Sequence, residues 1–258
     1  MSARSAAIQK WIIPLVVLAA WEASGRAGAL PRYLSYPSVI LAALWEAAAD
    51  GELAQAVLAS VYRVSAGFVL GTAAGLIVGV SAGLARGVRN FFDPLVSALF
   101  AVPKIAFLPV FLLLFGLGHA SKIAIVGFSS FFPVFIASRH AVLSVDKTLL
   151  WAARNMGTPP RTMFFRVVIP AAAPQLLAGV RIGLAHAFVV LFAAELIGSH
   201  AGLTNLITEG ENAARFDLML AGIVAFAMLG FASDRLLLAL RRRVLKGQLV
   251  GTEEQSAP

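Results

Sequence analysis

The residues that could do chemistry are few, and they are scattered through long apolar runs. The sequence has four histidines and no cysteine, and no carboxylate stands at metal-ligand spacing from any histidine. Disulfides, thiolate nucleophiles and cysteine-based metal sites are therefore excluded. Ser129 and Ser130 lie in an apolar run, where a hydroxyl group more often bonds to the helix backbone than acts as a nucleophile. The sequence indicates neither a metal centre nor a catalytic group, so an enzyme is not expected.

Among the ionisable residues inside apolar runs or at their ends, where a charge is costly and by default suggests a function, four could line a translocation path, whereas Asp234 and Arg235 are expected to pair or to reach the interface. The four are Lys104, Arg181, His186 and Glu195. If the solute is an anion, the three basic residues could lower its barrier along a central path. Glu195 would repel an anion and suits a gate or a structural hydrogen bond. The alternative for all four is structural pairing or anchoring at the membrane interface, which is the preferred interpretation.

The composition places the whole chain in a membrane. Hydrophobic residues make up 59% of the 258 residues and charged residues only 13%, with a mean hydropathy of +0.84, whereas soluble domains carry about 25% charged residues. Several apolar runs are long enough to cross a bilayer as helices. The net charge of +8 could indicate nucleic-acid binding, but basic cytoplasmic loops explain it better. We therefore expect an all-α polytopic membrane protein with no nucleic-acid partner.

The apolar runs predict six transmembrane helices, at about residues 11–30, 64–84, 105–117, 123–138, 176–198 and 218–240. Residues 91–102 are expected to form an interfacial or partly inserted helix, because prolines at 94 and 103 interrupt the approach to the third run. A cleaved signal peptide ending near residues 27–29 is an alternative to the first span. The spans predict a single transmembrane domain over residues 1–258, with its core at about 60–240.

Lysine and arginine set the expected orientation of these spans. The basic residues of both termini, of the loop after the second span and of the stretch 146–174 fall on one side of the membrane. Basic residues on the opposite side are diluted by carboxylates such as Glu46, Asp50 and Glu209. Both termini are therefore expected in the cytoplasm.

A ladder of glycines marks the second predicted span. Its members recur at every fourth position: Gly67, Gly71, Gly75, Gly79 and Gly83. Residues at this spacing share one helix face, and a face without side chains lets another backbone approach closely. The ladder could be a sliding or dimerising surface, but static packing within one subunit is the preferred interpretation.

The polar and basic stretch 146–174 is too long to be a simple connection between two spans. Asp146 suits the N-cap of a helix that begins at Lys147. Gly157 suits the left-handed position that ends a helix. The apolar residues between them form a stripe at positions i, i+3, i+4 and i+7, namely Leu149, Ala152, Ala153 and Met156.

A second short helix is expected directly afterwards. Thr158 suits its cap and Pro159 its first position, and Pro170 should end it. Its apolar stripe consists of Met163, Phe164, Val167 and Val168. The two helices would form an elbow near the membrane surface, which is either a docking surface for a partner or an element that lies on lipid.

The elbow resembles the cytoplasmic signature of permease subunits of binding-protein-dependent ATP-binding-cassette importers. That signature is Glu-Ala-Ala, three residues, glycine, nine residues, isoleucine, any residue and Leu-Pro. Ala152-Ala153, Gly157, Val167 and Ile169-Pro170 match it at the same spacing. Trp151 stands in place of the glutamate, and the lost carboxylate could weaken or alter an ion pair with the ATPase.

Further stretches are similar to one branch of that family, the permeases for nitrate, sulfonate, taurine, bicarbonate and thiamine precursors. These stretches are PKIAFLPVFLLLFGLG, SKIAIVGFSSFFPVF, IPAAAP, GVRIGLAHAF and AAELI. The similar region spans roughly residues 60–207.

The resemblance implies a type I importer fold, with the elbow as the coupling helix that seats in a groove of the ATPase subunit. The residues carried over to this role are Trp151, Ala152, Ala153, Arg154, Gly157, Thr158 and Pro159. The resemblance also implies a bacterial inner-membrane location, a second permease copy, two ATPase subunits that bind ATP and Mg, and an external solute-binding protein. The chain has no G-x-x-x-x-G-K-[ST] loop, so no cofactor is expected in it.

The expected function is uptake of a small anion, such as a sulfonate, taurine or nitrate, by alternating access. An ion-coupled secondary carrier is the alternative. Such a carrier would need no docking elbow and usually shows paired broken helices in two inverted halves. An intramembrane enzyme is disfavoured because no catalytic groups converge in the spans. The sequence does not identify the solute, which the binding protein largely selects in such systems.

Overall fold

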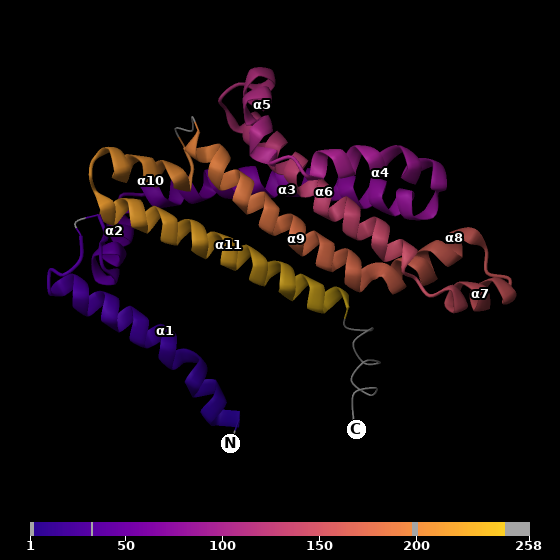
Figure 1. Cartoon of the computed structure of the whole chain (residues 1–258), viewed down its shortest axis with the longest axis horizontal. Coiled ribbons are helices and arrows are strands. Elements are labelled where there is room, and N and C mark those ends of the chain that lie inside the picture. The colour runs from indigo at the N-terminus through magenta and orange to yellow at the C-terminus, as the bar shows by residue number, and fades with distance from the viewer. Residues whose placement is uncertain (1–2, 32, 198–200, 246–258) are drawn as a thin grey trace. The chain divides into compact units, whose positions relative to one another are not determined.

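The computed structural model describes residues 3–31, 33–197 and 201–245, with side chains from residue 12 onward. Every regular element in these ranges is helical (Figure 1), so the predicted all-α class is confirmed. The elements are α1 (Ala3–Arg26), α2 (Pro37–Ala49), α3 (Glu52–Leu84), α4 (Arg86–Phe100), the 3₁₀ segment η1 (Lys104–Phe107), α5 (Leu108–Phe115), α6 (His119–Leu143), α7 (Lys147–Asn155), α8 (Pro160–Met163), the π segment η2 (Phe164–Val168), α9 (Ile169–Leu196), α10 (Leu203–Asn212) and α11 (Phe216–Val244).

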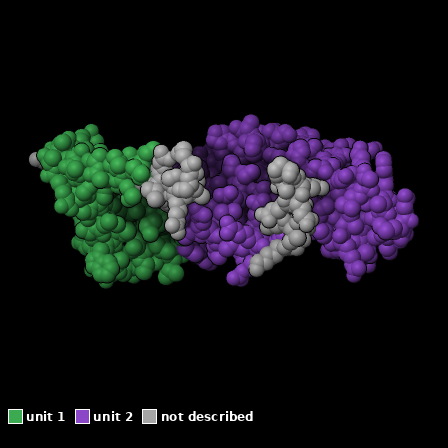
Figure 2. Space-filling model, turned by 90° about the horizontal axis from the view of Figure 1, so that it is seen from below, with its two compact units in different colours: residues 1–60, 199–229 green, residues 61–198, 230–258 purple. Residues whose placement is uncertain are grey.

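The chain forms two compact units (Figure 2). Unit 1 comprises residues 1–60 and 199–229, and unit 2 comprises residues 61–198 and 230–258. The single domain expected over residues 1–258 stays a prediction.

Four helices in the described ranges are long and apolar enough to cross a membrane. They are α3, α6, the continuous helix Pro160–Leu196 and α11, and four of the six predicted spans fall on them. A fifth crossing is counted if α4 and α5 form one broken span. The first predicted span coincides with α1, which is outside this set, so that span stays a prediction.

Unit 1 combines apolar packing with a surface ion-pair network. Ile40 of α2 and Ala221 of α11 are buried in one cluster. The guanidinium of Arg215 donates to Glu46 at 2.8 Å and to Asp217 at 3.3 Å. These hydrogen bonds raise the pKa of the Arg215 guanidinium, and the bond to Glu46 has the larger effect. The network therefore ties the residue before α11 to α2 at any physiological pH.

The segment from α4 to α5 is a broken helix. Its axis turns by 97° between Arg86–Phe100 and Lys104–Phe115. Pro103 has no N–H with which to continue the hydrogen bonding of α4, which confirms the break predicted there. The third predicted span is shortened to α5, which has only eight residues.

Pro170 does not end a short helix, so that prediction is wrong. The chain is helical without interruption over Pro160–Leu196. A wide turn precedes the proline, in which the N–H of Ile169 donates to the carbonyl of Phe164, five residues back. The α-helical pattern of backbone hydrogen bonds is already interrupted at this turn. The missing N–H of Pro170 therefore breaks no further bond, and the proline is tolerated.

The glycine ladder of α3 lies against α6 of the same chain. All its members contact that helix: Gly67, Gly71, Gly75, Gly79 and Gly83. A Cβ atom built at Gly67 would lie 2.6 Å from the carbonyl oxygen of Ile123, and one at Gly83 would lie 2.6 Å from the Cβ of Val142. Such distances are too short for real atoms, so only glycine allows the two backbones to approach this closely. The ladder is covered within the subunit.

Replacing Gly71 by alanine should force α3 away from α6, because the added Cβ would meet the backbone of Gly127. We expect a loss of about 1–3 kcal/mol in stability, measured as a lower midpoint of thermal unfolding in detergent. Gly87→Ala is the matched control, since nothing lies within 4 Å of its Cβ position and alanine favours a helix. Equal midpoints for the two variants would show that close packing at Gly71 does not stabilise the fold.

Candidate functional site

The local signals at the elbow place α7. The carboxylate of Asp146 accepts a hydrogen bond from the backbone N–H of Thr148 at 2.7 Å, which confirms the predicted N-cap. Gly157 has a φ of +72°, as predicted for the residue that ends the helix. The second helix begins one residue later than predicted, because Pro159 rather than Thr158 occupies its N-cap position.

One face of α7 is anchored in the protein. Ala153 is buried, and Leu150 packs against an apolar cluster supplied by the end of α6 and by the helix that follows α7. This cluster meets α7 on the side of Leu150, so of the four residues of the predicted stripe only Ala153 is buried. Leu149, Ala152 and Met156 point outward and are exposed.

Several apolar side chains of α7 and of its C-cap residue Met156 are exposed, beside the polar Thr148 and Asn155. We call Leu149, Trp151, Ala152 and Met156 the outer face. Trp151 is 60% exposed and Met156 is 78% exposed. The surrounding exposed basic residues are Lys147, Arg154, Arg161 and Arg166, whereas Asp146 is the only acidic residue between positions 146 and 168. Large apolar side chains left bare in this way mark an interaction surface.

A groove of about 420 Å³ borders this region. Arg154 and Arg161 line it together with apolar side chains, among them Leu84 at the end of α3 and the exposed Phe165. The interaction surface therefore extends from α7 toward the end of a membrane-spanning helix.

A buried ion pair joins α3 to α9 within unit 2. Arg63 Nη1 donates to Glu195 Oε1 at 2.8 Å, and the two side chains are only 3% and 0% exposed. Arg63 Nε also donates to Nδ1 of His119, the first residue of α6, at 3.1 Å. One guanidinium thus connects three helices, and Glu195 is enclosed by the protein.

Lys122, in the first turn of α6, is buried beside this pair. Its ammonium donates to the carbonyl oxygen of Leu117 at 2.5 Å. A buried charge is stable only when it is well partnered, so this bond fastens the start of α6 to the loop before it.

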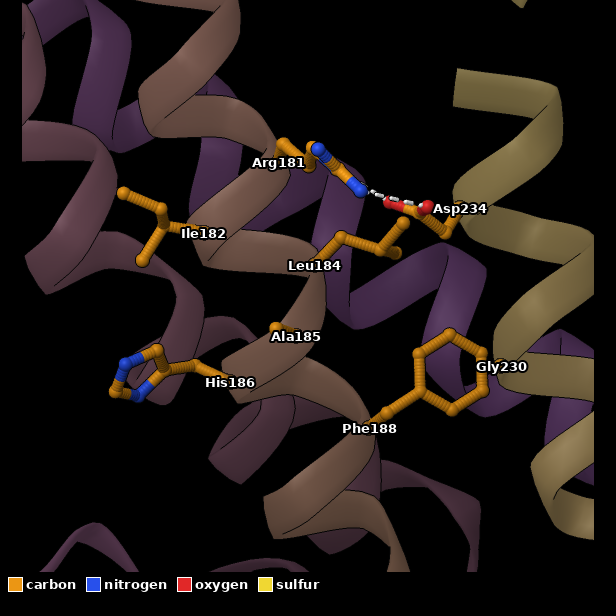
Figure 3. A pocket seen from close by; sticks show the side chains of 8 residues that line it. All are labelled: Arg181, Ile182, Leu184, Ala185, His186, Phe188, Gly230 and Asp234. Atoms are coloured by element: carbon orange, nitrogen blue, oxygen red, sulfur yellow. Dashed lines mark hydrogen bonds and ion pairs between the residues drawn. The ribbon is translucent and has the colours of Figure 1, made fainter. Parts of the chain in front are cut away.

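A second ion pair lies between α9 and α11 (Figure 3). Arg181 donates from Nε and Nη2 to the two carboxylate oxygens of Asp234, at 2.6 and 2.9 Å. The pair lines a mostly apolar groove of about 550 Å³. His186 points to the other side of α9 (Figure 3). The charge of Arg181 is therefore neutralised by Asp234, and His186 lines the same groove without joining this pair.

Lys104 occupies the bend between α4 and α5. Its Nζ donates to the carbonyl oxygens of Phe100 and Val102, both at 2.8 Å. The ammonium lies 5.2 Å from the ring centre of Phe100 and 4.9 Å from that of Phe132. It forms no ion pair with any side chain in the described ranges.

Comparison with known proteins identifies the chain's family. Residues 71–246 match the family model described as binding-protein-dependent transport system inner membrane component. The chain belongs to this family. It is thus a permease subunit, as its resemblance to importer permeases implied.

Named relatives align over much of this permease. It is 33% identical over 236 residues to the putative aliphatic sulfonates transport permease protein of Bacillus subtilis (strain 168), covering 91% of this chain and 86% of that protein. The taurine transport system permease protein of Escherichia coli (strain K12) is 34% identical over 157 residues, 61% of this chain and 57% of its own length. The riboflavin transport system permease protein of Chloroflexus aurantiacus (strain ATCC 29366 / DSM 635 / J-10-fl) is 30% identical over 216 residues, 83% of this chain and 81% of its own length.

Sequence reasoning about this permease missed Arg63, His119 and Lys122. It placed all three in loops or at span ends, where basic residues report orientation. The start of α3 at Glu52 would have predicted the burial of Arg63, because a helix that begins there places Arg63 about three turns from its end. Nothing local to Lys122 predicts its burial, which arises from contacts between distant helices.

Removing one partner of the buried pair would leave the other charge unpaired inside the permease, which typically costs about 3–5 kcal/mol. Glu195→Leu should therefore lower the thermal unfolding midpoint strongly, and the double variant Arg63→Leu/Glu195→Leu should recover much of the loss. Glu46→Leu, which removes an exposed pair, is the control and should cost at most about 1 kcal/mol. If the double variant is no more stable than Glu195→Leu, the two residues do not act as a unit.

Proposed function

We propose that this permease is the membrane-spanning part of an ATP-driven importer and that its ATPase docks on the outer face of α7. One observation carries the proposal: a short helix is anchored on one face and presents bare apolar side chains with basic neighbours on the other. A protein partner that buries this face would remove Trp151 and Met156 from water. Membership of a binding-protein-dependent family supports a separate energy source.

The residues that match the coupling helix of related permeases would have different roles in docking. Trp151, Ala152 and Arg154 are exposed and would contact the ATPase. Ala153 is buried and would anchor the helix from behind. Gly157 permits the left-handed turn that holds the outer face in place. Thr158 and Pro159 would continue the contact surface beyond this turn. Trp151 would supply apolar area where related permeases carry a glutamate.

Movement of α7 would pass directly to the spans. The cluster beneath α7 includes Val142 at the end of α6 and Val168 and Leu176 of the following helix. α6 packs along α9, and the glycine ladder packs α3 on α6. An ATPase dimer that contacts α7 differently when open and closed would shift the equilibrium between two helix packings. Alternating access would be the result.

The working assembly would contain two copies of this chain, two ATPase subunits and an external solute-binding protein. Within one copy α9 has an uncovered side, on which Ile182 and Val189 are exposed although neighbouring residues of the helix are buried. A second copy would cover this side. The ATPase subunits would bind ATP and Mg, and the permease itself would need no cofactor.

The proposed cargo is a small anion such as a sulfonate, taurine or nitrate. Two of the three relatives named above are called permeases for aliphatic sulfonates and for taurine, whereas the third is called a riboflavin permease. The unpaired ammonium of Lys104 also favours an anion over a cation.

The proposed location is the bacterial inner membrane, with both termini and α7 in the cytoplasm. Exposed basic residues around α7 support this orientation. The acidic residues that follow α2 would then lie outside.

Ala152→Arg should block docking without disturbing the fold, because Ala152 is an exposed helical residue. A charge forced into an apolar contact should reduce ATP-driven uptake and copurification of the ATPase at least about tenfold, the equivalent of about 1.4 kcal/mol. Ala49→Arg is the matched control, an exposed alanine at the end of another short helix. Normal uptake by the Ala152 variant would contradict the docking role, and uptake driven by an ion gradient in the absence of the ATPase would indicate a secondary carrier.

The orientation can be read from single cysteines, because the natural chain has none. A membrane-impermeant maleimide added to intact spheroplasts should label Asp50→Cys but not Arg243→Cys, since both positions are exposed on the protein and only the first is expected outside. Both should react after the membrane is permeabilised. The opposite labelling pattern would reverse the proposed orientation.

A further inference from the structure

The four ionisable residues singled out in the sequence separate into two classes. Arg181 and Glu195 each form an ion pair with another side chain. Lys104 and His186 form none in the described ranges. Only the second class can present a charge or a polar hydrogen to a passing solute without first losing a carboxylate or guanidinium partner.

Lys104 stands where the backbone is irregular. No helix continues through residues 101–103, and Ala101 and Pro103 are exposed within the subunit. At membrane depth irregular backbone is tolerated where it is buried in protein or lines a water-filled cavity, but not where it faces lipid. The exposed break between the amphipathic α4 and the apolar α5 therefore suits a side of the bend that faces another protein chain or an aqueous path rather than lipid.

The ammonium of Lys104 is held firmly but is not saturated. Two of its hydrogens point to the carbonyl oxygens of Phe100 and Val102, and the rings of Phe100 and Phe132 flank it. An ammonium has three donors, so one N–H has no partner in the described residues. The bend thus positions a cation with one donor available.

His186 reaches the same region from α9. The 3₁₀ segment η1, which begins with Lys104, packs on α9. Ile105, the residue after Lys104, packs against a cluster that contains Val190 of α9, about one turn from His186. His186 lies on the uncovered side of α9 and points away from the ion pair of Arg181 (Figure 3). The two groups that have no ion-pair partner therefore come together on one side of unit 2.

We propose that Lys104 and His186 form an anion-binding site within the membrane, at the break between α4 and α5. The inference rests on the proposed function as an importer of small anions. An oxyanion would accept the available N–H of Lys104 and a ring N–H of His186, and the exposed ring of Phe100 would provide an apolar wall for an organic anion. A single cation offsets part of the cost of dehydrating the anion, and a site with few donors still releases it.

The absence of cysteine in the natural chain allows a chemical test. The permease would be reconstituted with its ATPase and binding protein, and ATP-driven uptake of ethanesulfonate, taurine and nitrate would be measured. Lys104→Cys should reduce uptake of the transported anion roughly tenfold or more, the effect of losing a hydrogen bond to a charged group. Reaction with 2-aminoethyl methanethiosulfonate forms a mixed disulfide, releases methanesulfinate and restores an ammonium, so uptake should recover.

Three controls separate charge from structure. Methyl methanethiosulfonate forms a neutral disulfide at the same cysteine and should not restore uptake. Arg235→Gln removes another cation that lies over an aromatic ring, at 4.7 Å from the ring centre of Phe231, and should leave uptake unchanged. Lys104→Arg, which keeps the charge, should retain most of the uptake.

The outcomes distinguish this inference from the proposed function. If the wild-type complex imports none of the three anions with ATP, the proposed function fails and the site fails with it. If the wild type imports one of them and Lys104→Cys does so equally well, only the site is wrong. Equal recovery with the neutral reagent would assign Lys104 a purely structural role. Should the Lys104 variants fail to copurify with the ATPase, His186→Gln decides: a raised KM for the anion supports the site, and an unchanged KM overturns it.

Discussion

The contact between α3 and α6 is the constraint on which the rest of unit 2 depends. Along five positions no side chain separates the two backbones on the α3 side, so the helices cannot slide or separate by small rotamer changes. α6 in turn packs along α9, and α7 is anchored between the ends of these two helices. A force applied to α7 therefore acts on a single stiff body, which is what a lever requires.

Most of the charges buried within unit 2 connect one helix to another through ion pairs. Arg63 connects α3, α6 and α9 through Glu195 and His119, at the start of α6, whereas α7 follows its end. Arg181 and Asp234 form a similar connection between α9 and α11. In an apolar environment a paired charge is tolerated and a broken pair is costly. These two ion pairs therefore connect the helices of unit 2, whereas Lys104 forms no ion pair in the described ranges.

The success of sequence reasoning depended on how local each signal was. The cap at Asp146 and the turn at Gly157 involve neighbouring residues only, and both were predicted correctly. The apolar stripe of α7 did not indicate which side of the helix is buried, because that side is decided by the cluster it meets. The wide turn before Pro170 leaves no recognisable pattern either. The family resemblance was detected because its motif combines local turn chemistry with fixed spacing.

The charge sites illustrate the same limit at longer range. Glu195 and Arg63 are 132 residues apart, so their pairing depends on how three helices assemble. Lys104 and Arg181 looked alike as isolated cations in apolar runs. Only the position of Asp234 on another helix distinguishes them.

The π segment η2 has a consequence for the register of the helix that contains it. A π turn holds one residue more than an α turn, and each residue of a helix corresponds to about 100° of rotation. The residues before Phe164 are therefore out of phase with α9 by about that angle. Arg161 and Met163 therefore do not face the directions that they would face if the helix were regular from Leu176 back to Pro160. The chain thus carries a one-residue phase shift between α8 and α9.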